Sequence, residues 1–209
     1  MKIQFLGLIF FLLSLSGCGQ KNVSHQTNSK SADLNYKAMS LAKFISSIDS
    51  AQKAIILLDS ATAIDSNNYL AYFNKLMFLN KLKQYHKAII TTNNLIRLRP
   101  NAHDIYIIGG IFCEKINDTI SSKNYFQKSL NICNITLDTM SIENSDYELI
   151  TMNRAVNLIM LNKNAEANSV LQKLSETQTN EDMRKISLSM LNINKKDLIE
   201  LYYSEKSIH

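Results

Sequence analysis

The chain has 209 residues, of which 45% are hydrophobic, so it is long enough to bury a substantial core. It contains one proline and only five glycines, and this shortage of turn-forming residues argues against folds built from many short strands. The formal net charge is +5, but the basic residues are scattered and not interleaved with aromatic residues, so no nucleic-acid-binding surface is predicted. These properties predict an all-α protein.

The N-terminal segment 1–17 has the features of an export signal. An apolar run, residues 3–15, follows Lys2 and is too short for a membrane-spanning helix, which requires about 20 residues. The run leads into the sequence Leu15-Ser16-Gly17-Cys18. This sequence resembles the lipobox of bacterial lipoproteins, and the resemblance implies cleavage before Cys18 and attachment of a diacylglycerol to its thiol. We therefore expect an exported protein with a lipid anchor in the cell membrane or outer membrane. The alternatives are an ordinary signal peptide with an incidental cysteine, or an anchor that is not cleaved.

Residues 18–33 are predicted to form the lipidated cysteine and a flexible tether. Val23 and Ala32 are the only aliphatic side chains between Gly19 and Asp33. As a flexible coil, this segment would span about 20 Å. The folded domain is expected to comprise residues 34–209.

Beyond the tether, residues of similar type recur at intervals of 34 positions. The series include Ala54, Ala88 and Ser122; Leu58, Thr92 and Phe126; Ile64, Leu98 and Ile132; and Ala38, Tyr72 and Tyr106. A constant period of this length predicts stacked copies of one helix–turn–helix unit. With Pro100, the only proline, placed near the end of a copy, the copies span residues 35–68, 69–102 and 103–136.

This pattern resembles the tetratricopeptide repeat, in which two antiparallel helices, A and B, approach closely because small residues face each other. The resemblance implies a right-handed α-solenoid of antiparallel helix pairs. A degenerate fourth copy is predicted at about 148–181, with Ala155 and Ala167 at the small positions. Two short apolar-periodic runs in residues 182–204 would cap the stack, because a solenoid needs its last apolar face covered.

In the tetratricopeptide family, the concave inner face comes mainly from helix A. The resemblance places on this face Tyr36, Met39 and Lys43 from the first copy, Leu70, Phe73, Met77, Asn80 and Lys81 from the second, Asp104, Ile107, Ile111 and Glu114 from the third, and Met152 and Val156 from the fourth. Methionine and aromatic side chains together favour binding of an amphipathic helix or an extended peptide. Two alternatives remain: the chain's own C-terminal helices occupy this face, or these residues are core between helices.

No catalytic or metal-binding pattern is evident in the sequence. No two histidines have the spacing of metal ligands, and the adjacent side chains of His103 and Asp104 are expected to diverge. We therefore expect no enzymatic activity and no cofactor other than the covalent lipid. Cys113 and Cys133 would lie about 10–15 Å apart in a helical hairpin, beyond the reach of a disulfide, so two free, buried thiols are predicted.

The function predicted from these features is a membrane-anchored scaffold that binds envelope proteins or peptides. A second hypothesis is an accessory module that binds glycans or peptidoglycan. Such a module would need several exposed aromatic residues on the inner face, and Tyr36 and Phe73 are few for that purpose.

Overall fold

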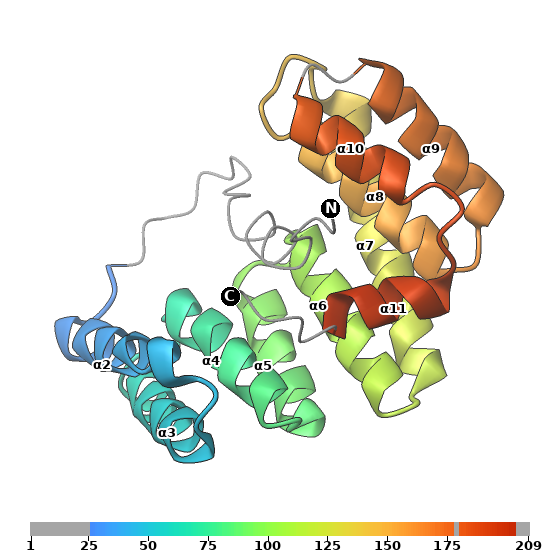
Figure 1. The fold of residues 1–209 in the computed structure, drawn as a ribbon. Helices are drawn as coiled ribbons and strands as arrows, with labels where there is room; N and C mark the ends of the chain where they lie inside the picture. The colour runs from blue at the N-terminus through green and yellow to red at the C-terminus, as the bar shows by residue number, and fades with distance from the viewer. Residues whose placement is uncertain (1–25, 178–179, 204–209) are drawn as a thin grey trace. The chain divides into compact units, whose positions relative to one another are not determined.

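The computed structural model describes residues 26–177 and 180–203, and every regular element in these ranges is helical, which confirms the predicted all-α class (Figure 1). The predicted signal segment and the predicted lipidation site, Cys18, lie outside the described residues. Two compact units divide the chain, with the boundary between Ser122 and Lys123.

The first unit contains five α-helices and one short 3-10 helix. They are α2 (Ser29–Ser40), η1 (Ala42–Phe44), α3 (Ile48–Ile64), α4 (Tyr69–Lys81), α5 (Tyr85–Leu98) and α6 (His103–Lys115). Consecutive α-helices from α2 to α6 pack against each other, and α2 also contacts α4 (Figure 1). Consecutive packing of this kind is the arrangement of an α-solenoid.

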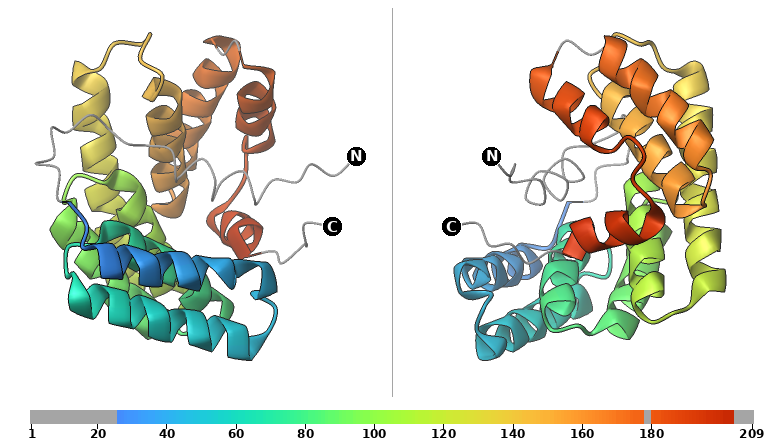
Figure 2. Two further views of the ribbon diagram at one scale, coloured as in Figure 1. Left: turned by 90° about the vertical axis from the view of Figure 1, so that its left-hand side faces the viewer. Right: turned by 45° about the vertical axis from the view of Figure 1, so that its right-hand side comes forward.

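The second unit contains most of α7 and four further helices. They are α7 (Thr119–Thr139, which begins in the first unit), α8 (Tyr147–Met160), α9 (Asn164–Thr177), α10 (Glu181–Ser189) and α11 (Lys195–Tyr203). α8 packs against α9 and α9 against α10, but α11 contacts α8. Figure 2 shows that α11 does not lie beside α10 but beyond an extended connecting segment.

The 34-residue period follows the buried side of α3, α5 and α7. Ala54, Ala88 and Ser122 have no exposed surface, and neither have Leu58, Thr92 and Phe126. Small residues at the first series allow helix axes to approach closely, and the second series contributes larger side chains to the core. The period is therefore a property of core packing.

The turns that follow α4, α6 and α8 share one backbone geometry. Lys83, Asn117 and Asn162 have φ angles of 56°, 59° and 60°. In each turn the next amide N–H donates to the carbonyl five residues earlier, as from Gln84 to Leu79 over 2.9 Å. This left-handed termination satisfies carbonyls at the helix end. The left-handed residue is the fifteenth of its copy in each case, because the predicted second, third and fourth copies begin at residues 69, 103 and 148.

The first helix pair departs from the period of the sequence. The ends of α3 and α5, Ile64 and Leu98, are separated by one period, whereas the starts of α2 and α4, Ser29 and Tyr69, are further apart. The connection 41–47, which contains η1, takes up part of this difference because the corresponding connection is only 82–84. α2 therefore begins at position 29 where the period predicts 35, a six-residue shift, and residues 29–33, expected in the tether, are helical.

Contacts at the start of each pair show the same six-residue shift. The Asn28 N–H donates to Asp65 Oδ2 over 3.0 Å, where α2 begins and α3 ends. At the corresponding place in the next pair, the Arg99 guanidinium lies 3.9 Å from the centre of the Tyr69 ring. Asp65 and Arg99 are separated by one period, but the capping residues Asn28 of α2 and Asn68 of α4 are 40 positions apart, so Ser29 of α2 corresponds to Tyr69 of α4.

A buried hydrogen-bond chain joins the first two pairs in this register. Asn68 Nδ2 donates to Ser31 Oγ over 2.8 Å, and Ser31 Oγ donates to the Ala61 carbonyl over 2.7 Å. Ser31 and Ala61 have no exposed surface. Because an unsatisfied buried donor costs about 1–3 kcal/mol, this chain opposes any slip of α2.

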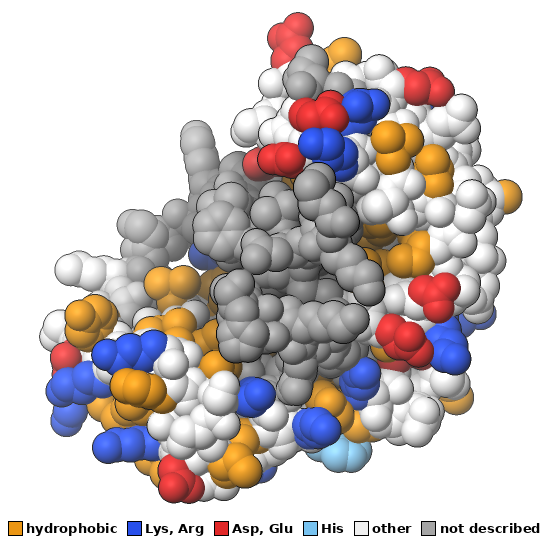
Figure 3. All heavy atoms as spheres, viewed as in Figure 1, with side chains coloured by type: hydrophobic (Ala, Val, Ile, Leu, Met, Phe, Trp, Pro, Cys, Tyr) orange, Lys and Arg blue, Asp and Glu red, His pale blue; other side chains and the backbone are white. Residues whose placement is uncertain are grey.

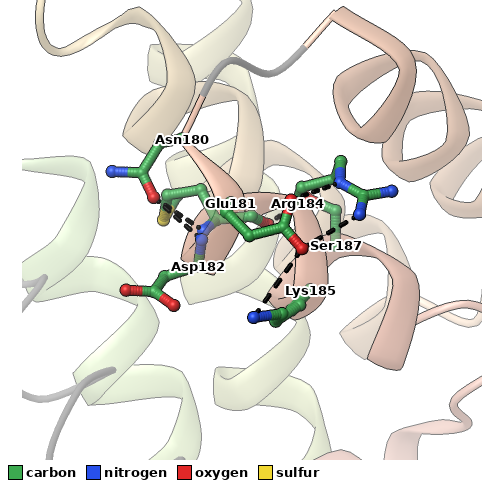
Figure 4. Close-up of polar contacts among 7 residues, drawn as sticks. Asn180, Glu181, Asp182, Arg184, Lys185 and Ser187 are labelled. Carbon is green, nitrogen blue, oxygen red and sulfur yellow. Dashed lines mark hydrogen bonds and ion pairs between the residues drawn. The ribbon is translucent and has the colours of Figure 1, made fainter.

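The short helix α10 is held by a cap, local ion pairs and one buried side. Asn180 Oδ1 accepts the amide N–H groups of residues 182 and 183, and Glu181 pairs with Arg184 at 2.9 Å and with Lys185 at 3.7 Å (Figure 4). These exposed ion pairs contribute little to stability. Met183, Ile186 and Ser187 are buried, and α10 packs against α9. The apolar side therefore supplies most of the attachment.

Candidate binding surface

Three predicted site residues form an accessible apolar stripe on α4. Leu70, Phe73 and Met77 are spaced by three and four residues, so they share one side of the helix. Leu70 is 61% exposed, while Phe73 and Met77 are half-buried. We call Leu70, Phe73 and Met77 the α4 stripe. Because large apolar side chains gain by leaving water, this stripe is suited to an apolar ligand.

A charged stripe occupies the corresponding side of α2. With the six-residue shift of this helix, the counterparts of Leu70, Phe73 and Met77 are Lys30, Asp33 and Lys37. These three charged residues are exposed, and Lys37 pairs with Asp33 at 2.7 Å. We call them the α2 stripe. The sequence analysis did not predict this stripe. The 34-residue period lies on α3, α5 and α7, and it gave no sign that the connection between α2 and α3 is longer than the one between α4 and α5.

The α2 and α4 stripes lie on neighbouring helices in a fixed register. α2 contacts α4, and Asn74 Nδ2 of α4 donates to Asn35 Oδ1 of α2 over 2.8 Å. The surface therefore presents charged groups on one helix and apolar groups on the next, an arrangement that matches the two sides of an amphipathic peptide.

The site residues predicted for the first copy lie elsewhere. Tyr36 is 75% exposed and Met39 is half-buried on α2, whereas Lys43 belongs to η1. The Lys43 ammonium lies 5.0 Å from the centre of the exposed Phe44 ring. Since α2 is shifted by six residues, these three positions do not correspond to the α4 stripe. Figure 3 shows hydrophobic and basic side chains interleaved over the surface of α2 and α3.

Two side-chain amide oxygens near the C-terminal end of α4 are buried without a hydrogen bond to the described part of the chain. Asn80 and Lys81, both predicted site residues, are half-buried there. Asn80 Oδ1 and Gln84 Oε1 are buried and have no hydrogen-bond partner among the described residues. Burial of an unpaired amide oxygen is unfavourable, and neither oxygen is accessible from the surface, so neither contributes to the binding surface.

An aromatic pair borders the α4 stripe at its other end. The rings of Tyr69 and Phe73 stack with centroids 6.2 Å apart, and Arg99 lies over the Tyr69 ring. Burial, and then the nearby Asp104 carboxylate, raise the pKa of Tyr69 far above its usual value. The phenol therefore stays neutral at physiological pH. Packing of this kind restrains the Phe73 side chain.

The predicted residues of the third copy are almost entirely buried. Ile107, Ile111 and Asp104 are buried with the rest of residues 103–113, and Glu114 is half-buried and accepts a hydrogen bond from Ser122 Oγ. Residues 103–113 of α6 therefore do not form an exposed surface in this structure.

Two ionisable groups are buried at the start of α6. Burial raises the pKa of the Asp104 carboxyl to about 6, although its backbone hydrogen bonds and Arg99 oppose the shift. No ion pair joins Asp104 to another residue of the described ranges. Burial lowers the pKa of His103 to about 4. Burial therefore shifts both groups toward their neutral forms, as expected away from water, so that His103 is neutral at pH 7 whereas Asp104 becomes neutral only below about pH 6.

The predicted residues of the fourth copy are also buried. Met152 is 6% exposed and Val156 is 3% exposed, and both belong to α8, the helix that α11 contacts. Burial of these two residues, on a helix that α11 contacts, is what the alternative predicts in which the C-terminal helices cover part of the inner face.

The described residues show no group of three or more His, Cys, Asp or Glu side chains arranged to hold a metal ion. Among the same residues, no helix combines the length and apolar character needed to span a bilayer. Cys113 and Cys133 are both buried and form no disulfide bond within the described ranges, as predicted. Burial, together with Asp118 and Glu114, raises the pKa of Cys113 to about 11, so its reactive thiolate form is disfavoured.

No protein-family model matches this chain, and no curated protein matches it either. The tetratricopeptide resemblance therefore stays a prediction from the sequence. The exposure, charge and contacts of the α2 and α4 stripes provide the basis for proposing a function.

Proposed function

We propose that this protein is a lipid-anchored, exported scaffold of the tetratricopeptide type that binds a peptide or helix of another envelope protein. The observation that carries this proposal is the exposed Leu70, aligned with Phe73 and Met77 and flanked by the charged α2 stripe. A partner helix with one apolar and one charged side would match both stripes.

The physical basis is the burial of apolar surface. Complete burial of one leucine side chain contributes about 1.5–3 kcal/mol, and Phe73 and Met77 add partly exposed surface beside Leu70. The α2 stripe contributes mainly to orientation, because exposed ion pairs contribute only about 0–1 kcal/mol each.

The lipid anchor would keep this surface near a membrane. Cys18 and Asn28, which caps α2, are ten positions apart. A fully extended chain of about ten residues spans at most about 35 Å. Partners located at or near the bilayer surface would therefore be within reach, which favours envelope proteins as ligands.

Site-specific photo-crosslinking tests the binding surface. A photoreactive amino acid replaces Leu70 in the full-length protein, and the matched control replaces Ile90 of α5. These aliphatic side chains are similarly exposed, at 61% and 63%. We expect irradiation of intact cells to yield a protein adduct at position 70 and not at position 90. Equal adducts at both positions, or recovery of glycan without protein, would contradict the proposal.

Fractionation of cells tests the anchor. Cys18→Ser removes the thiol that would carry the lipid, so the variant is expected to lose lipid labelling and stable membrane association, whereas Cys113→Ser retains both. Two acyl chains provide stable anchoring, at about 0.8 kcal/mol for each buried CH₂ group. Unchanged lipid labelling of Cys18→Ser would exclude this anchor and leave the binding surface to be judged separately.

A further inference from the structure

The last described helix, α11, has one buried side. It contacts α8 of the same unit. Leu198, near its middle, has no exposed surface, whereas Lys196 and Glu200 are exposed. Asn194 Oδ1 accepts the Asp197 N–H over 3.0 Å, so the helix has its own N-terminal cap. α11 is thus an amphipathic helix attached through its apolar side.

The helix α8 carries a methionine-rich stripe that is also buried. Met152, Val156 and Met160 recur every four residues, and all three are buried. We call them the α8 stripe. Asn157 lies outside this stripe and donates from Nδ2 to Ser129 Oγ of α7 over 2.8 Å. The side of α8 that contacts α7 is therefore not the side that carries the α8 stripe.

We propose that α11 covers the α8 stripe, that this stripe is a second helix-binding site, and that an amphipathic helix of a partner protein replaces α11 there. The partner helix would present leucines three residues apart, as Leu198 and Leu201 do. Methionine side chains suit such exchange because they are flexible and adapt to different apolar shapes. This inference rests on the proposed binding role and adds the class of partner.

The length and connection of α11 are consistent with exchange. It has only nine residues, and isolated helices shorter than about 12 residues are marginal in water. Its helicity therefore depends on contacts such as that with α8. As a tethered ligand, it competes at an effective concentration on the order of millimolar. Only a partner that binds more tightly than α11 would displace it, which gives the site selectivity.

Methionine oxidation measures whether α11 covers the α8 stripe. The full-length protein in detergent is treated with hydrogen peroxide, and mass spectrometry follows the sulfoxides of Met152 and Met160. Leu198→Asn removes the buried apolar contact, and Leu188→Asn is the matched control because Leu188 is 43% exposed on α10. We expect Leu198→Asn to accelerate oxidation of both methionines by about tenfold or more, which equals about 1.4 kcal/mol, and Leu188→Asn to leave it unchanged.

A peptide added in trans tests whether the site accepts a separate helix. A peptide with the sequence of residues 193–203, in large excess over Leu198→Asn, should restore protection of Met152 and Met160. The same peptide with Leu198→Asn should not. If oxidation accelerates but the peptide gives no protection, α11 is a structural cap and the proposal is wrong.

Met190 serves as an internal reference, because it is buried at the end of α10. If Met190 oxidises as fast as Met152 in Leu198→Asn and in the milder Leu198→Ala, α11 belongs to the fold of the unit and the proposal fails. Unchanged oxidation of Met152 and Met160 in both variants also overturns it. None of these outcomes depends on Cys18 or on crosslinking at position 70, so failure here is distinguishable from failure of the proposed function.

Discussion

The predicted inner sides of α4 and α8 carry similar residues in opposite environments. On α4, Leu70 is mostly exposed and its neighbours Phe73 and Met77 are half-buried, whereas on α8 Met152 and Val156 are buried and α11 lies against the helix. Both sets come from equivalent positions in the predicted repeats. A repeat position therefore specifies the side of a helix but not whether a ligand can reach it.

The largest expected effect separates these two sides. Leu198→Ala should weaken the docking of α11 by about 2–5 kcal/mol, because it removes a fully buried leucine side chain. Leu70→Ala should change the free energy of unfolding by no more than about 0.5 kcal/mol, as for exposed positions. Hydrogen exchange of the α11 amides measures the first effect, and urea denaturation of the full-length chain measures the second. Equal losses of free energy in the two variants would show that Leu70 and Leu198 do not differ in how much packing they contribute.

A smaller effect concerns Asp104, the buried carboxyl group of the predicted inner face. Burial raises the pKa of its carboxyl from 3.8 to about 6. Between these values the folded state binds more protons, so this group lowers stability as pH rises, and its full cost is present above about pH 6. At pH 7.5, Asp104→Asn should therefore raise the free energy of unfolding by about 1–3 kcal/mol. The gain should disappear at about pH 3.

The control for Asp104→Asn is Asp182→Asn, which alters an exposed acidic residue in the first turn of α10. It should cause a small loss, about 0.3–1 kcal/mol, through the helix dipole, and no gain at pH 7.5. Denaturation by urea at pH 7.5 and at pH 3.5 measures both variants. A gain for Asp104→Asn of the same size at both pH values would show that its charge is not the cause.

His103, next to Asp104, should act in the opposite direction. Its pKa is lowered from 6.5 to about 4, so the unfolded state binds more protons between these values and this contribution to stability is lost as pH falls. His103→Gln should therefore flatten the loss of stability between about pH 6.5 and pH 4 by up to about 3 kcal/mol, at about 1.36 kcal/mol per unit. A denaturation series across this range checks the slope. An unchanged slope would show that His103 is not its source.

The smallest expected effect lies in the turn after α4. Lys83 has a φ of 56°, whereas asparagine occupies the corresponding left-handed positions 117 and 162. Lys83→Gly should raise the free energy of unfolding by about 0.5–1 kcal/mol, because glycine avoids the side-chain strain of this conformation. Lys53→Gly, in the middle of α3, should lower it by about 1 kcal/mol. Thermal unfolding of both variants would reveal these opposite signs, and a loss from both would count against strain at Lys83.

Prediction from sequence worked best where the residues are buried and failed where connections differ in length. Ala54, Ala88 and Ser122 are small and buried, and their constant spacing reveals the core-facing side of three helices. The displacement of α2 left no such trace, because the buried series on the B helices continues unchanged. The α2 stripe, Lys30, Asp33 and Lys37, was missed because charged residues in a polar segment look like part of a tether.

The sequence by itself determined the helical class and the periodic core. The scarcity of glycine and proline favoured long helices, and close packing of those helices required small residues at a regular interval. Only the tertiary structure decided the register of α2 and which predicted site residues are accessible. Register depends on contacts such as Asn28 with Asp65, and accessibility depends on neighbours that are distant in sequence, as α11 is from α8. A period in the sequence describes one unit, whereas exposure depends on what packs against it.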